Sequence, residues 1–145
     1  MSCYFVVVRS AVARTAVPLF MCHDCVVTQT VLIVDDHPSF RASARAILEA
    51  DGFEVIGEAE NGTAGLAELR RLRPDVVLLD VQLPDMTGFD VCIEPGHIGQ
   101  LDTTSVVLVS SRDATDYGSL IAQSGARGFI AKADLSGEAV VNLLK

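Results

Sequence analysis

The sequence lacks several features that mark disulfide-stabilised, membrane and nucleic-acid-binding proteins. Its 145 residues include four cysteines, three of them within the first 25 residues, which is too few and too uneven for a disulfide framework. The 11 Lys and Arg are outnumbered by 19 Asp and Glu, and the formal net charge of −8 argues against a general nucleic-acid-binding face. We therefore expect a reduced, cytoplasmic protein that makes no direct contact with nucleic acid.

The N-terminal segment, residues 1–29, has no sustained helical or strand period. It is apolar and basic, but Arg9 and Arg14 divide it into pieces shorter than a membrane span, and no clean cleavage site follows. The C-x-x-C at residues 22–25 has no second ligand pair to complete a zinc site. We expect no membrane contact, and a disordered extension or a native start near residues 26–27. An intact mass of the natively expressed protein that matches the full sequence would contradict the later start.

From Thr30 onward, short apolar runs alternate with stretches of helical period. The runs expected to form strands are residues 31–34, 53–57, 75–80, 105–109 and 127–131. Strands this apolar are typical of a parallel sheet that is covered on both faces, and the connections must then be right-handed crossovers. The sequence predicts one α/β domain over residues 30–145, a (βα)5 doubly wound three-layer sandwich.

The sequence signals for helix starts and ends differ in strength among the helices expected between these strands. One begins at Pro38 and ends before Gly52, and a second is capped by Asn61 and ends before Pro74. Two more are expected over residues 114–123 and from about 135 to the C-terminus. The third crossover helix is interrupted by the Pro and Gly at residues 95–96, so we expect it to be short or distorted.

Charged and hydroxyl side chains stand where the predicted strands end. Asp35 and Asp36 end the first strand, Asp80 the third, Ser110 the fourth and Lys132 the fifth. The carboxyl ends of parallel strands meet at one edge of the sheet, where ligands bind. Carboxylates gathered there suit Mg²⁺, a Lys suits a phosphate-like group, and a Ser hydroxyl can donate to a phosphoryl oxygen. The chemistry that this set favours is phosphoryl transfer.

From residue 31 to its end, the sequence resembles the receiver domains of two-component response regulators. Asp80 lies 44 residues after Asp36, Ser110 follows 30 residues after Asp80, and Lys132 follows 52 residues after it. These spacings match the chemotaxis receiver, and LPDMTGFD at residues 83–90 is similar to the loop that follows the phosphoacceptor in the family. The resemblance implies the flavodoxin-like strand order 2-1-3-4-5. The sequence KADLSGEA at residues 132–139 resembles the corresponding sequence of receivers that are usually joined to a helix-turn-helix output domain, although we expect no output domain here.

The resemblance also implies a role for each site residue. Asp80 would accept a phosphoryl group from a sensor histidine kinase or a phosphotransfer protein, and the chain would catalyse only its own phosphorylation and dephosphorylation. Mg²⁺ would be held by Asp35, Asp36, Asp80 and the backbone carbonyl of Gln82. Lys132 and Ser110 would bind phosphoryl oxygens, and Ser110 and Phe129 would act as switch residues. The phosphorylated domain would then bind an output partner, with a homodimer among the options.

Each of these residues also has a plainer interpretation when it is taken alone. Asp35 could cap the helix after it, Ser110 could be a turn residue, Lys132 a solvated charge and Phe129 a core residue. His37 is expected in an exposed loop. Two other functions stay open: a pseudo-receiver that binds partners without phosphorylation, and a Mg²⁺-dependent phosphohydrolase. The hydrolase is the weaker of the two, because the residues after Asp80 lack a second acid.

Overall fold

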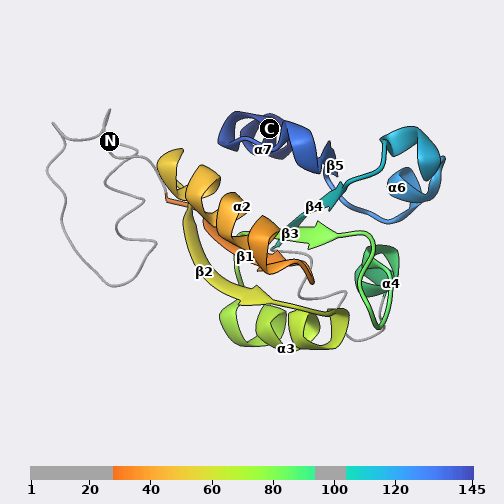
Figure 1. The fold of residues 1–145 in the computed structure, drawn as a ribbon, viewed down its shortest axis with the longest axis horizontal. Helices are drawn as coiled ribbons and strands as arrows, with labels where there is room; N and C mark the ends of the chain where they lie inside the picture. The colour runs from red at the N-terminus through yellow and green to blue at the C-terminus, as the bar shows by residue number, and fades with distance from the viewer. Residues whose placement is uncertain (1–27, 94–103) are drawn as a thin grey trace, which may run out of the picture.

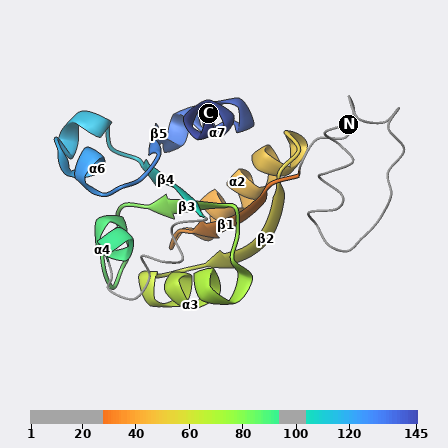
Figure 2. The same ribbon diagram turned by 180° about the vertical axis from the view of Figure 1, so that it is seen from behind.

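A computed structural model describes residues 28–93 and 104–145 of the protein, and these form a parallel sheet between two layers of helices (Figures 1 and 2). The five strands are β1 (Thr30–Val34), β2 (Glu54–Ala59), β3 (Val76–Asp80), β4 (Ser105–Ser110) and β5 (Gly128–Ala131). Every pairing between them is parallel, and the order across the sheet is β2-β1-β3-β4-β5. The predicted fold class and strand order are therefore confirmed.

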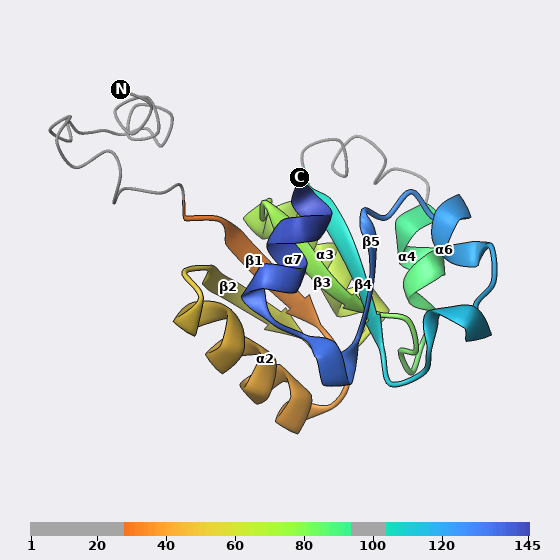
Figure 3. The ribbon, with the colours of Figure 1, turned by 90° about the horizontal axis from the view of Figure 1, so that it is seen from above.

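The helices divide between the two faces of the sheet, as the view from above shows (Figure 3). The α-helices are α2 (Pro38–Ala50), α3 (Gly62–Leu72), α4 (Gly88–Ile93), α6 (Leu120–Gln123) and α7 (Gly137–Leu144). Helices α2 and α7 cover one face, where Leu48 and Val140 join the core. Helices α3, α4 and α6 cover the other, where Leu69 and Val91 pack. With both faces covered, β3 is buried at every residue, which explains its unbroken apolar sequence.

Local signals in the sequence set the ends of two helices. Pro38 occupies the first turn of α2, where its missing N–H costs nothing. The side chain of Asn61 accepts a hydrogen bond from the Ala64 N–H at 2.7 Å and so caps α3, as predicted. That helix ends at Leu72, and Arg73 adopts a left-handed conformation (φ 47°) before Pro74. Helix α2 therefore starts shortly after the end of β1, and α3 ends shortly before the start of β3.

The prediction of one helix over residues 114–123 is wrong. The structure has a 3-10 turn, η2 (Ala114–Asp116), and then the four-residue α6. The local cause of the separation is Gly118, which lies between the two and has a positive φ of 57°; the capping box of Asp113 and Asp116 marks the start of η2. A left-handed residue ends a helical turn, and Gly adopts that conformation without steric cost.

Smaller differences concern the ends of other elements. Strand β2 runs two residues beyond the expected 53–57, because Glu58 and Ala59 pair with the end of β1. Lys132 opens a 3-10 turn, η3 (Lys132–Asp134), instead of ending β5, and the last helix starts at Gly137. Within the described residues, helix α4 runs from Gly88 to Ile93. The residues of two predictions, 95–96 and most of 1–29, lie outside the described part of the chain. Among those that are described, no helix is long and apolar enough to cross a bilayer.

Candidate functional site at the carboxyl edge of the sheet

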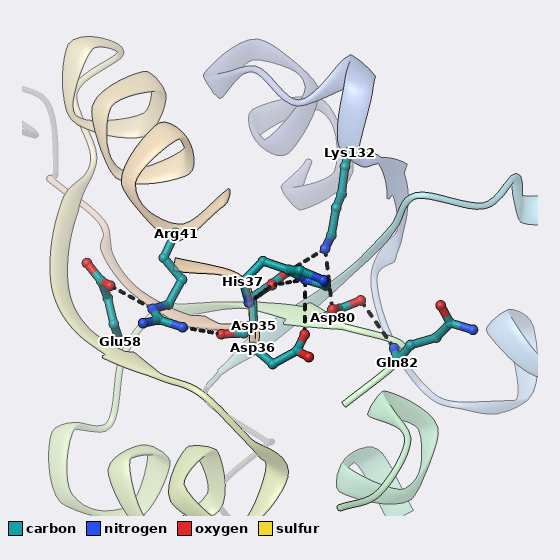
Figure 4. A network of polar contacts seen from close by, with 8 residues as sticks. All are labelled: Asp35, Asp36, His37, Arg41, Glu58, Asp80, Gln82 and Lys132. Atoms are coloured by element: carbon teal, nitrogen blue, oxygen red, sulfur yellow. Dashed lines mark hydrogen bonds and ion pairs between the residues drawn. The ribbon is translucent and has the colours of Figure 1, made fainter. Parts of the chain in front are cut away.

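The site is built around two buried carboxylates that share one Lys (Figure 4). Asp35 follows β1 and Asp80 ends the neighbouring strand β3, and they are 0% and 2% exposed. Lys132, from the start of η3, places its Nζ 2.7 Å from Asp35 Oδ2 and 3.3 Å from Asp80 Oδ2. The strand order therefore brings three of the predicted residues, 45 and 52 positions apart in the sequence, into direct contact.

Burial and like charge act together on Asp80. Removal from water and then repulsion by Asp35 raise the pKa of the Asp80 carboxyl from 3.8 to about 6, against the Gln82 N–H and Lys132, which lower it. The Gln82 N–H donates to Asp80 Oδ1 at 3.1 Å, so each oxygen of this carboxylate faces one donor. The group is held in a fixed orientation and ionises reluctantly. Once ionised, an oriented carboxylate with a raised pKa is more basic than a free one, which suits a nucleophile beside a cation.

The acid pair is held in place by contacts from α2 and β2. The backbone N–H of His37 donates to Asp35 Oδ1 at 2.8 Å, and His37 Nδ1 lies 3.1 Å from that oxygen and 3.0 Å from Asp36 Oδ1. Arg41 Nη1 donates to the carbonyl of Asp35 at 2.6 Å, while its Nε donates to Glu58 at 3.0 Å. Arg41 thus fastens the turn that carries both acids to β2, as Figure 4 shows.

The Lys132 side chain is also confined. Its Nζ lies 4.5 Å from the centroid of the Phe40 ring, a cation–π distance, and the side chain is 15% exposed. Phe40 belongs to α2, so the helix that covers the acid pair also covers its counter-ion. The peptide bond between Lys132 and Ala133 is trans.

The residues present fit a divalent cation. Oxygens of Asp35, Asp36 and Asp80, with a ring nitrogen of His37, lie within 4.8 Å of one another. Asp35 Oδ2 and Asp36 Oδ1 are buried and make no hydrogen bond of good geometry; their close contacts are Lys132 Nζ at 2.7 Å and His37 Nδ1 at 3.0 Å. These carboxylate oxygens keep lone pairs for a cation, and hard oxygen ligands of this kind are those that Mg²⁺ prefers. Asp35, Asp36 and Asp80 are therefore the residues that would hold the ion.

Ser110 and Phe129 are not part of this contact network. Ser110 is fully buried at the end of β4, and its Oγ lies 2.6 Å from Tyr117 Oη and accepts a hydrogen bond from the Arg112 N–H at 3.1 Å. Phe129 is half-buried in β5 with its ring centroid 5.8 Å from that of Tyr117. Within the described residues, the Ser110 hydroxyl makes no hydrogen bond to Asp80 or Lys132. The two predicted switch residues instead meet at Tyr117.

The loop after Asp80 is held by its own set of contacts. A Cβ on Gly88 would lie 2.6 Å from the carbonyl oxygen of Asp80. Asp85 accepts hydrogen bonds from the Gly62 and Thr63 N–H groups and from Thr63 Oγ1, which ties the loop to the start of α3. The Thr63 contacts, with that of Gly62, hold the pKa of Asp85 at about 2. These contacts fix the backbone on which Asp80 and Gln82 sit.

Sequence reasoning missed the supporting residues of the site. It placed His37 in an exposed loop, and the side chain is 62% exposed, but its ring reaches both acids. Arg41 carried a usable signal, since it lies one helical turn after the residue that precedes α2 and on the side of the acid pair. Tyr117 carried none, because a turn rather than a helix brings it back over Ser110.

The comparisons with known proteins agree on one family. Residues 31–142 match the model of the response regulator receiver domain. The chain is 40% identical over 100 residues to the DNA-binding response regulator MtrA of Mycolicibacterium smegmatis, over 61% of this chain and 42% of MtrA. It is 33% identical over 103 residues to the response regulator GacA of Pseudomonas syringae, over 70% of this chain and 47% of GacA.

A solved structure gives the same result. The chemotaxis response regulator CheY4 of Vibrio cholerae superposes with a TM-score of 0.68 at 28% identity, over 81% of this chain and 96% of CheY4. The chain spans about half the length of the curated relatives it matches. The expectation of no direct contact with nucleic acid gains no support here, because MtrA is named as a DNA-binding protein.

Proposed function

Because this chain belongs to the response regulator receiver family, we propose that it is a phosphoacceptor of a two-component pathway, with Asp80 as the residue that is phosphorylated. The observation that carries the proposal is the contact of Lys132 with both Asp35 and Asp80 at an edge where three carboxylates gather. A metal cation would offset the negative charge of this cluster, and Lys132 would pair with a phosphoryl group on Asp80.

The proposed reaction moves a phosphoryl group from a donor histidine to Asp80. The P–N bond of the phosphohistidine breaks as a P–O bond forms to a carboxylate oxygen of Asp80, and the imidazole keeps the electron pair of the broken bond. When bound at Asp35, Asp36 and Asp80, Mg²⁺ would neutralise charge on the phosphoryl oxygens. The backbone carbonyl of Gln82 is proposed as a further ligand. Lys132 would pair with one phosphoryl oxygen and Ser110 would donate to another.

The consequence of phosphorylation is proposed to be a switch of a partner-binding surface. Phe129 pairs with Leu108, two residues before Ser110 in β4, and its ring packs on Tyr117, which bonds to Ser110, so a movement of the Ser110 hydroxyl can be transmitted to a half-buried ring. In this proposal the protein meets its kinase or phosphotransfer donor, and its output partner, in the cytoplasm. The reactions that it catalyses are its own phosphorylation and dephosphorylation.

The test is phosphorylation by a small donor. We expect the protein, incubated with acetyl phosphate and Mg²⁺, to gain the mass of one phosphoryl group in an acid-labile adduct. The adduct should be absent in Asp80→Asn and unchanged in Glu54→Gln, an exposed acid at the opposite end of the sheet. A folded protein that forms no adduct would support the pseudo-receiver function instead. Rapid turnover of phosphomonoesters would support the hydrolase.

A further inference from the structure

The Ser110 side chain is engaged by a residue outside the predicted site. Its Oγ lies 2.6 Å from Tyr117 Oη, a short hydrogen bond in which either hydroxyl can be the donor. A Ser hydroxyl has one proton and two lone pairs. The Arg112 N–H, donating at 3.1 Å, takes one lone pair, and Tyr117 takes either the proton or the other lone pair. The hydroxyl is thus oriented towards Tyr117 while Asp80 is unmodified.

Tyr117 is held in a position where it touches both predicted switch residues. It follows η2, and its N–H donates to the Ala114 carbonyl at 3.1 Å. Its ring packs between Phe89 of α4, with centroids 5.6 Å apart, and Phe129 of β5, with centroids 5.8 Å apart. Aromatic pairs at these distances stabilise one ring orientation. Tyr117 therefore contacts Ser110 through its hydroxyl and Phe129 through its ring.

We propose that Tyr117 is a positioning residue that holds the Ser110 hydroxyl in the unphosphorylated protein and releases it when Asp80 is phosphorylated. The inference rests on the proposed phosphoacceptor function. In this proposal Ser110 is the donor in its bond to Tyr117, and its single proton cannot also go to a phosphoryl oxygen. A bond to a charged phosphoryl oxygen is stronger than a bond between two neutral hydroxyls, so the exchange favours release. Tyr117 is half-buried, so its freed hydroxyl can bond to water.

The exchange has a consequence for Phe129 and Phe89. When the Tyr117 hydroxyl loses its partner, its ring is no longer fixed at both ends, and the two rings that pack against it can reorient with it. Phe89 belongs to the helix that follows the Asp80 loop, and Phe129 to the strand that precedes Lys132. Tyr117 therefore links the state of the Ser110 hydroxyl to two segments on either side of the site.

The test uses Tyr117→Phe, which removes the hydroxyl and keeps the ring between Phe89 and Phe129. Because a neutral hydrogen bond is then no longer lost on release, we expect the ratio of phosphorylated to free protein at a fixed acetyl phosphate concentration to rise about two- to tenfold. In a Ser110→Ala background the same substitution should change nothing. Thr115→Val, which removes an exposed hydroxyl in the same turn, is the matched control and should leave the ratio unchanged.

A spectroscopic measurement separates positioning from a purely structural role. The chain has two Tyr residues, so Tyr4→Phe protein labelled with 3-fluorotyrosine reports on Tyr117 alone. We expect its ¹⁹F resonance to move on phosphorylation, and to move in the unphosphorylated protein when Ser110 is replaced by Ala. An equal effect of Tyr117→Phe in both Ser110 backgrounds, or a resonance that phosphorylation leaves in place, would overturn the positioning role alone. A wild-type protein that takes no phosphoryl group would overturn the proposed function as well.

Discussion

Replacing Asp80 by Asn should make the metal-free protein more stable at neutral pH. The carboxyl of Asp80 is 2% exposed and its pKa is raised from 3.8 to about 6, chiefly by burial and then by Asp35. Each pKa unit corresponds to about 1.4 kcal/mol, so keeping this carboxylate ionised in the folded state costs up to roughly 3 kcal/mol. Asn has nearly the same shape and carries no charge, and it can still accept from the Gln82 N–H.

The sign of the pH dependence follows from the direction of the shift. The folded state holds the Asp80 proton up to about pH 6, whereas the unfolded chain releases it near 3.8. This group therefore contributes no penalty below about pH 4, a growing penalty between about pH 4 and 6, and the full penalty above. The stabilisation by Asp80→Asn should be close to zero at the acid end of that window and greatest at pH 7 and above.

Urea unfolding with a chelator present, measured at several pH values between about 4 and 8, is the assay. Glu54→Gln serves as the control, because an exposed acid should change the free energy of unfolding by less than about 0.5 kcal/mol. Millimolar Mg²⁺ should stabilise the wild type and narrow its difference from the variant. A variant that is neutral or less stable than the wild type at pH 7, or a difference that does not vary with pH, would refute the reasoning.

Two further predictions concern the loop that follows Asp80. Gly88→Ala should lower the free energy of unfolding by about 1–3 kcal/mol and reduce phosphorylation, because its Cβ would lie 2.6 Å from the backbone oxygen of Asp80, which cannot move aside. In the same unfolding experiment Gly62→Ala should cost less, because the new Cβ would meet the flexible Met86 side chain. Asp85→Ala should lower the free energy of unfolding by about 1 kcal/mol at pH 7. Because the pKa of Asp85 is lowered to about 2, its stabilising contribution should fade as pH falls from about 4 towards 2. Equal stabilities of variant and wild type at pH 7 would contradict this prediction.

The sheet could be predicted from the sequence because its strands carry their own signal. Val76–Asp80 is buried at every position, and an unbroken apolar run is the pattern that such burial produces. Strand β2 was less well bounded, because Glu58 interrupts the apolar pattern while its backbone still pairs with Ile33. The edge residues Asp35, Asp80 and Lys132 followed from the strand ends alone, since parallel pairing leaves little freedom in where those ends meet.

The rest of the site depends on contacts that have no period in the sequence. The prediction of one helix over residues 114–123 is wrong because Gly118, whose positive φ divides the segment, interrupts the helical pattern. That division carries Tyr117 back over Ser110. The helical position of Arg41 indicates only that it lies on the side of the acid pair, and nothing in the spacing indicates its contacts with the Asp35 carbonyl and Glu58. Supporting residues of this kind are found only once the turns are known.

The carboxyl edge of the sheet gathers buried negative charge. Asp35 and Asp80 are buried side by side and share Lys132 as their cation, and Asp36 Oδ1 is buried beside the His37 ring. A buried site with an excess of negative charge opposes folding. A cation at the acid cluster removes that penalty, and a phosphoryl group then gives Lys132 and the Ser110 hydroxyl a shared partner. The release of Ser110 from Tyr117 is then the step by which the phosphorylated state would differ in shape from the free one.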